Sequence, residues 1–139
     1  MKNAGLSFWL VGILALVING FGLFDMLMTV SQNEDYLASY TPEQVAYFND
    51  LPGWRIAIWV LGVCAALLAT LLFLAKRKLS VPLFAVAPVM MIIGFVHDAA
   101  EDGLALYGVG GTLFALAILG IQIFFFWYAR RLAKNGLLN

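Results

Sequence analysis

Four long apolar stretches alternate with short polar segments along this chain of 139 residues. A helix needs about 20 apolar residues to cross the hydrocarbon core of a bilayer. The pattern predicts four such spans, at about 6–30, 53–75, 81–98 and 109–129. Because backbone groups in hydrocarbon must be hydrogen-bonded internally, we expect an all-α membrane protein, a four-transmembrane-helix bundle with up-down-up-down connections.

The polar segments between the predicted spans are short. Residues 31–52 and 99–108 are predicted as two loops at one end of the bundle, and residues 76–80 as a turn at the other end. These connections leave no room for a soluble domain with its own core. We therefore expect a single integral membrane domain over residues 1–139.

The first loop contains a helix start signal. Thr41 has the position of an N-cap, Pro42 that of the first helical residue and Gln44 that of the third, which is the pattern of a capping box. Apolar residues then recur on one helical face, at Val45, Phe48 and Leu51. We expect a short amphipathic helix that lies flat on the outer surface, either as a loop stabiliser or as a lid.

Charged residues are sorted between the two ends of the predicted bundle. All acidic residues lie on the side of the two loops: Asp25, Glu34, Asp35, Glu43, Asp50, Asp98, Glu101 and Asp102. All basic residues except Arg55 lie on the other side: Lys2, Lys76, Arg77, Lys78, Arg130, Arg131 and Lys134. Since Lys and Arg accumulate in cytoplasmic segments, both termini are predicted to be cytoplasmic, in a bacterial inner membrane.

Composition supports the membrane assignment and excludes several kinds of chemistry. The chain is 63% apolar and 12% charged, far from the values of about half and about a quarter in soluble proteins. Cys64 is the only cysteine, which excludes an intrachain disulfide or a dithiol pair, and His97 is the only histidine, which excludes bis-histidine haem ligation. The sequence has no nucleophile elbow, phosphate-binding loop or zinc-protease motif. We expect no enzyme, cofactor or metal site, and no nucleic-acid partner.

Polar residues inside apolar spans are costly to bury and are functional candidates by default. Asp25 and Arg55 lie near the outer ends of the first two spans, which residues 31–52 join. We therefore predict that Arg55 pairs with Asp25, either to hold the spans together or to bind or gate a solute. Asn19 and His97 complete this candidate ion-pair or solute site.

A second group of polar residues follows the third span. On a helix, His97 lies over Glu101 and Asp98 lies over Asp102, so all four side chains share one face. We expect a solvated helix cap. An outer vestibule sensitive to pH or cations, or a divalent-cation site, is the alternative.

Small residues recur every four positions in the second span, at Gly62, Ala66 and Thr70. Such a stripe lets helices approach closely. We expect it to pack within the chain, with a homo-oligomer interface as the alternative. Pro88 removes a backbone hydrogen bond within the third span and should kink it.

Residues 8–80 contain several short motifs. They are Asn-Gly-Phe-Gly at 19–22, Asp25, Thr-Pro-Glu-Gln at 41–44, Tyr47-Phe48 and Pro52-x-Trp54. This set resembles a family of small four-span bacterial inner-membrane proteins that are often labelled as sugar transporters. The resemblance implies a fold and a location but assigns no functional residue, and it does not extend to His97.

Two functions remain after these exclusions. The first is a non-catalytic accessory or assembly protein that lies in the lipid bilayer and holds a membrane-protein partner. The second is a small-solute transporter of the sugar type, or a solute-binding membrane protein, that uses polar residues in the outer half of the bundle. Polar groups near the midplane are few for a sugar with many hydroxyls, which favours the accessory role.

Overall fold

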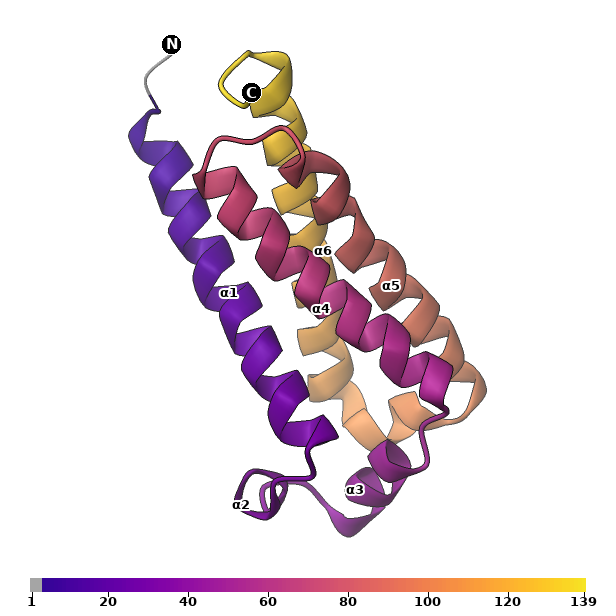
Figure 1. Cartoon of the computed structure of the whole chain (residues 1–139). Helices are drawn as coiled ribbons and strands as arrows, with labels where there is room; N and C mark the ends of the chain where they lie inside the picture. Colours follow the sequence, from indigo (N-terminus) through magenta and orange to yellow (C-terminus); the bar gives the residue numbers. More distant parts are fainter. Residues whose placement is uncertain (1–3) are drawn as a thin grey trace.

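The computed structural model describes residues 4–139, and these fold entirely into helices and connecting turns (Figure 1). Four helices are long and apolar enough to cross a membrane: α1 (Leu6–Val30), α4 (Gly53–Leu74), α5 (Ser80–Ala100) and α6 (Gly103–Lys134). The prediction of an all-α protein with four helices of membrane-spanning length is confirmed.

Two short helices, α2 (Glu34–Leu37) and α3 (Pro42–Asn49), lie between α1 and α4. Asn33 caps α2 by accepting a hydrogen bond from the backbone N–H of Tyr36. At the start of α3, the Thr41 hydroxyl accepts from the Gln44 backbone N–H, and the Gln44 side chain accepts from the Thr41 N–H. Both helix starts are therefore set by local side chains rather than by packing.

The bundle has two chemically different ends. One end, here called the basic end, carries the start of α1, the C-terminal residues and the turn between α4 and α5 (Figure 1). The other, the acidic end, carries α2, α3 and the connection between α5 and α6. Helix α4 packs against both α1 and α5, and α5 also packs against α6. Lys2, from the basic set above, lies outside the described residues.

An aromatic core fills the basic half of the bundle. The rings of Phe8 and Phe73 stack with centroids 4.7 Å apart, and Phe84 lies 6.0 Å from Phe73 and 5.9 Å from Phe125. All four side chains are fully buried. They come from α1, α4, α5 and α6 respectively, so this core joins all four long helices.

Residues 137–139 close the basic end. The backbone N–H of Lys78 donates to the carbonyl of Asn139 at 2.7 Å, and the N–H of Asn139 donates to the carbonyl of Lys76 at 2.7 Å. Leu138 is fully buried beside the aromatic core. The segment after α6 is thus fixed to the turn between α4 and α5.

The small residues of α4 pack inside the chain. A Cβ atom at Gly62 would lie 3.1 Å from the Cβ of Met90 on α5, closer than most such contacts. Ala66 and Thr70 are buried, and they contact α1. The stripe therefore brings α4 close to α5 and α1.

The segment expected as a loop at 99–108 is mostly helical. Helix α5 continues to Ala100 and α6 begins at Gly103, so only two residues make the reversal, with Asp102 at a φ of 57°. Gly108 then interrupts α6 at a φ of 67°, a conformation that glycine adopts without steric cost. The polar residues that suggested a loop, Glu101 and Asp102, form this reversal, and the helical turn that follows from Gly103 to Tyr107 is mainly apolar.

Replacing Gly62 with leucine should destabilise the bundle, because the new side chain must displace Met90. Overpacking of this kind costs about 1–3 kcal/mol. Gly120→Leu is the matched control, since no atom lies within 4 Å of a Cβ at that exposed position of α6. Thermal unfolding in detergent should show a lower midpoint for Gly62→Leu only. Equal midpoints for the two variants would contradict the α4–α5 packing described above.

Candidate functional site

Three polar side chains form a hydrogen-bonded network at the centre of the bundle. The Thr70 hydroxyl donates to the Ala66 carbonyl at 2.9 Å and accepts from Asn19 Nδ2 at 2.9 Å. Asn19 Oδ1 in turn accepts from Gln122 Nε2 at 2.6 Å. All three side chains are buried, and they come from α1, α4 and α6. We call Asn19, Thr70 and Gln122 the central network.

The direction of each hydrogen bond in the central network is determined by its neighbours. Because the Thr70 hydrogen goes to Ala66, Asn19 must turn its NH₂ toward Thr70 and its Oδ1 toward Gln122. Gln122 therefore presents its own NH₂ to Asn19. Its carbonyl oxygen, Oε1, is buried and has no hydrogen-bond partner in the described part of the chain.

A second cluster surrounds Asp98 at the acidic end. Arg55 donates to both carboxylate oxygens, from Nη2 at 2.8 Å and from Nε at 3.2 Å. The hydroxyls of Tyr47 and Tyr107 donate at 3.0 and 3.2 Å, and His97 Nδ1 lies 3.0 Å from Oδ1. These five residues, the Asp98 cluster, join α3, α4, α5 and α6. Asp98 is buried, and both of its carboxylate oxygens have partners within this cluster.

Two glycines make room for the Asp98 cluster. A Cβ at Gly94 would lie 2.9 Å from Arg55 Cζ, so the guanidinium lies against the bare backbone of α5. A Cβ at Gly103 would collide with the Tyr47 hydroxyl. Close approach of a side chain to backbone is a position where glycine is required. The sequence contains both glycines, but nothing in their spacing reveals this role.

Asp25 is bound by tyrosines. Its Oδ1 accepts from the Tyr36 hydroxyl at 2.5 Å and from the Tyr40 hydroxyl at 3.5 Å, and both tyrosines lie in the segment that follows α1. Burial, followed by the hydrogen bond to Asp25, raises the pKa of Tyr36 far above its ordinary value, so Tyr36 is a neutral donor at physiological pH.

The predicted pair between Asp25 and Arg55 is therefore wrong. Arg55 lies along α5 over Gly94 and binds Asp98, while Asp25 binds hydroxyls instead of a cation. The prediction considered only that residues 31–52 join the spans of Asp25 and Arg55. The close packing of α4 on α5 brings a different carboxylate to the guanidinium.

The expected solvated cap holds for Glu101 and Asp102 but not for Asp98, which is buried, and the alternative of an outer cation site is not assembled. Asp98 points inward to Arg55, whereas Glu101 and Asp102 are exposed and His97 packs edge-on against Trp54. Among residues 4–139, no three His, Cys, Asp or Glu side chains come together to hold a metal ion. The reason is that α5 ends at Ala100, so the four residues do not continue along one helical face.

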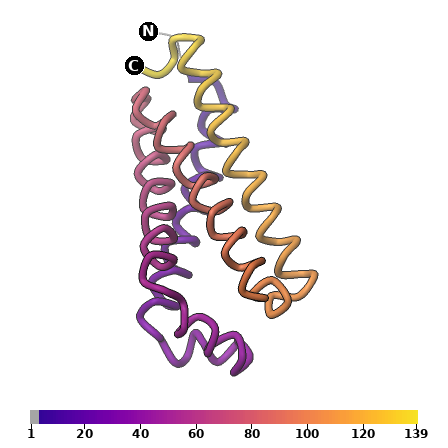
Figure 2. The backbone as a smooth tube through the Cα atoms, turned by 90° about the vertical axis from the view of Figure 1, so that its right-hand side faces the viewer, coloured from indigo at the N-terminus to yellow at the C-terminus, as the bar shows by residue number. Residues whose placement is uncertain are grey.

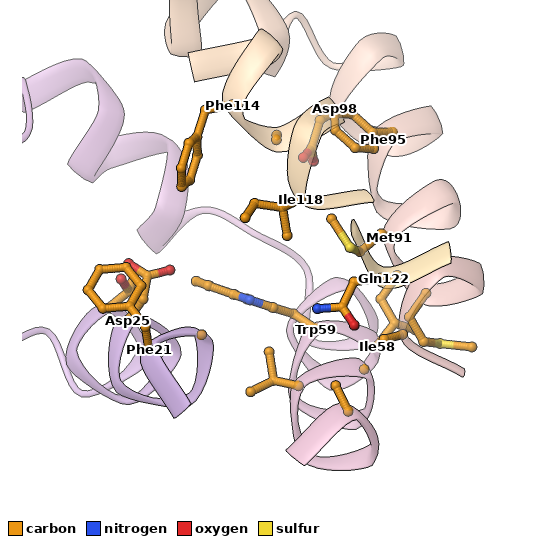
Figure 3. A pocket seen from close by; sticks show the side chains of 18 of the residues that line it. Phe21, Asp25, Ile58, Trp59, Met91, Phe95, Asp98, Phe114, Ile118 and Gln122 are labelled. Atoms are coloured by element: carbon orange, nitrogen blue, oxygen red, sulfur yellow. The ribbon is translucent and has the colours of Figure 1, made fainter. Parts of the chain in front are cut away.

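A cavity of about 590 Å³ lies between the central network and the acidic end. Asn19 and Gln122 line its floor, and Asp25, Arg55 and Asp98 line its acidic end. Figure 3 shows the side chains of Asp25, Asp98 and Gln122 around this space. Apolar and aromatic side chains make up most of its wall. Of the candidate solute site predicted from the sequence, Asn19, Asp25 and Arg55 line this one cavity, while His97 stands behind Asp98.

The cavity is open on the side between α1 and α6. Phe21 on α1 and Phe114 on α6 both line it, yet they are 59% and 64% exposed (Figure 3). The side-chain hydrogen bonds between the two helices, Asn19 to Gln122 and Ser7 to Tyr128, occur only at the floor and further toward the basic end. Figure 2 shows α1 and α6 separating toward the acidic end.

Residues 31–52 cover the acidic end of the cavity. Tyr40, Phe48 and Leu51 from this segment line it. Besides the hydrogen bond of Tyr47 to Asp98, Gln44 Nε2 donates to the Leu106 carbonyl at 2.8 Å, and the rings of Tyr47 and Phe48 pack against Tyr107 with centroids 6.3 and 6.5 Å away. The segment is thus a cover that spans from α1 to α6.

No protein-family model matches this chain, and neither a curated protein nor a solved structure shows significant similarity to it. The resemblance of residues 8–80 to the small four-span family therefore stays a prediction.

Asp98→Ala should strongly destabilise the protein, because it leaves Arg55 and the hydroxyls of Tyr47 and Tyr107 without their acceptor. Removing one partner of a buried ion pair costs about 3–5 kcal/mol. Asp50→Ala, at an exposed position after α3, is the control and should change little. The free energy of unfolding of each variant can be measured on purified protein in mixed micelles. Similar free energies for Asp98→Ala and Asp50→Ala would show that the Asp98 cluster does not stabilise the acidic end.

The free energy of unfolding should also fall at high pH, as the Tyr47 hydroxyl loses its proton. Burial and the hydrogen bond to Asp98 raise the pKa of Tyr47 to about 12 from its ordinary value of 10.0. Because the folded state holds the proton more tightly, this contribution is complete below pH 10 and is lost as the pH rises toward about 12. The difference in thermal midpoint between the parent protein and Tyr47→Phe should therefore narrow over this range. A constant difference would contradict the role of Tyr47 as a donor.

Proposed function

We propose that this protein is a non-catalytic, multi-pass membrane protein whose cavity binds a small lipophilic molecule that enters from the bilayer. It lies in a bacterial inner membrane as an up-down-up-down bundle with both termini cytoplasmic. The charge sorting supports this orientation, because the basic end carries the Lys76 to Lys78 turn together with Arg130, Arg131 and Lys134. The cavity and its cover, including the amphipathic helix α3, then lie in the outer half.

The observation that carries the proposal is the cavity itself. Its volume of about 590 Å³ falls within the range of about 300–1,000 Å³ that is typical of small-molecule sites. Its wall is mainly apolar, and its opening between Phe21 and Phe114 lies along the part of the bundle that faces hydrocarbon in a membrane. A ligand that partitions into lipid reaches the cavity without crossing water.

The same geometry disfavours a sugar as the ligand. The polar side chains around the cavity mostly bind one another, as Arg55 binds Asp98 and Asn19 binds Thr70. A solute with many hydroxyls would leave most of them unpaired against apolar walls, which is costly. An accessory role needs no cavity of this size. Of the functions expected from the sequence, the cavity therefore supports a solute-binding membrane protein over an accessory protein or a sugar transporter.

Filling the cavity should abolish ligand binding. Ala115 on α6 lines it, whereas Ala117 on the same helix is exposed and does not. Ala115→Phe should weaken binding of the neutral fluorescent probe N-phenyl-1-naphthylamine at least about tenfold, or about 1.4 kcal/mol. Ala117→Phe, the matched control, should leave it unchanged.

The measurement is energy transfer from tryptophan to the probe in nanodiscs, with empty nanodiscs as the background. Trp59 lies in the cavity wall and is the expected donor (Figure 3). A saturable signal that Ala115→Phe removes and Ala117→Phe keeps supports the proposal. The proposal fails if no saturable signal appears, or if both variants bind like the parent protein.

A further inference from the structure

The ionisable side chains that line the cavity do not balance in charge. One arginine and two carboxylates contribute, Arg55, Asp98 and Asp25, which leaves one net negative charge. Arg55 gives two hydrogen bonds to Asp98, so these two charges compensate each other. Among residues 4–139, the salt bridges of the structure all go to Asp98. Asp25 therefore has no basic partner.

Asp25 is half-buried near the acidic end of the bundle. It precedes the end of α1 at Val30 by five residues, which corresponds to about 7–8 Å along a helix. Within residues 4–139 its donors are the neutral hydroxyls of Tyr36 and Tyr40, and both hydrogen bonds go to Oδ1. An unpaired carboxylate at this depth is costly and is by default a site for a partner. Its second oxygen, Oδ2, remains available to one.

Aromatic residues lie near the carboxylate. Tyr36 and Tyr40 lie with ring centroids 6.0 Å apart, and Phe24 meets Tyr36 edge-on at 5.6 Å. Phe21 is beside Asp25 in the cavity, and Trp59 extends across the space in front of it (Figure 3). The faces of aromatic rings attract cations, and quaternary ammonium groups bind in cages of such rings. The aromatic wall and the negative charge of the cavity thus both favour a cationic ligand.

The floor of the cavity adds a requirement for a hydrogen-bond donor. Gln122 is 5% exposed and lines the cavity, and its Oε1 has no partner in the described residues. Its hydrogen bond to Asn19 prevents the amide from turning over. Asn19 precedes Asp25 by six residues on α1, so the floor lies about 9 Å deeper than the carboxylate.

From these observations we infer that the cavity binds a lipophilic cation, which is an amine or quaternary ammonium compound on an apolar body. The positive group lies against Asp25 and the tyrosines, the body lies along Trp59, and a donor group of the ligand reaches Gln122. This inference rests on the proposed function, since it names the class of ligand that enters the same cavity. The exposed side of the cavity admits such a compound from the lipid, where hydrophobic cations accumulate.

A competition experiment tests the inference. Tetraphenylphosphonium and tetraphenylborate have nearly the same shape and opposite charge, and each can displace bound N-phenyl-1-naphthylamine from protein in zwitterionic nanodiscs. Potency is expressed in free concentration, because both ions partition into lipid. We expect the cation to displace the probe at least about tenfold more potently than the anion, a ratio that corresponds to about 1.4 kcal/mol.

Variants assign the charge preference to one residue. Asp25→Asn should reduce the potency of tetraphenylphosphonium about tenfold relative to that of tetraphenylborate, measured against the same probe in the same variant. Asp50→Asn, at an exposed acid of the same cover, should behave like the parent protein, which excludes general attraction to the acidic surface. Asp25→Glu keeps the charge and should keep the preference for the cation.

The outcomes separate the two proposals. If the neutral probe does not bind the parent protein, the proposed function itself is wrong. If the probe binds but the cation and the anion compete equally, or if Asp25→Asn retains the preference, only the inference about the ligand is overturned. If Asp25→Asn no longer binds the probe, Asp25→Glu decides: a retained preference supports the inference, and a lost one overturns it.

Discussion

The buried carboxylate of Asp98 is the interaction on which the acidic half of the molecule depends. It is a single acceptor for Arg55 from α4 and for hydroxyls from α3 and α6, so three elements take their positions from one charge. A buried ion pair is stabilising only when further hydrogen bonds complete it, and here tyrosines and a histidine complete it. Because Arg55 and Asp98 compensate each other's charge, Arg55 does not neutralise the other carboxylate of the cavity, Asp25.

The two halves of the bundle use different means to hold four helices together. In the basic half, phenylalanine rings and small residues pack closely against one another. Hydrogen bonds between residues 76–78 and 139 close the end. In the acidic half, packing gives way to polar bridges from a covering segment, and a cavity remains. Close packing leaves little room for a ligand, whereas a half that is held by a few directional bonds leaves space between them.

Much of this architecture could be predicted from the sequence, because the signals involved are local or one-dimensional. The lengths of the apolar runs determine the long helices, and the bounds of α1 agree with the run from residue 6 to residue 30. The capping signal at Thr41 and Gln44 acts over three residues, so it can be recognised in the sequence without knowledge of the fold. The small residues of α4 also indicated close packing, although not which helix lies against them.

The polar contacts of the site could not be predicted, because they depend on how helices face one another. Arg55 binds Asp98 and not Asp25, since Gly94 leaves space for it along α5. The tyrosines that bind the carboxylates carry no charge and so were absent from an account based on charge sorting. A buried acid needs donors, and tyrosines in the neighbouring loop were the signal that could have indicated them.

The central network also has a consequence for the route of any ligand. Beyond Asn19 and Gln122, toward the basic end, the described residues form an aromatic core with Phe8, Phe73 and Phe125 fully buried. The cavity therefore ends at this floor, which side chains from three helices form, and it does not continue as a channel toward the basic end. A ligand of the proposed class would therefore enter and leave beside Phe21, on the acidic side of the floor that Asn19 and Gln122 form.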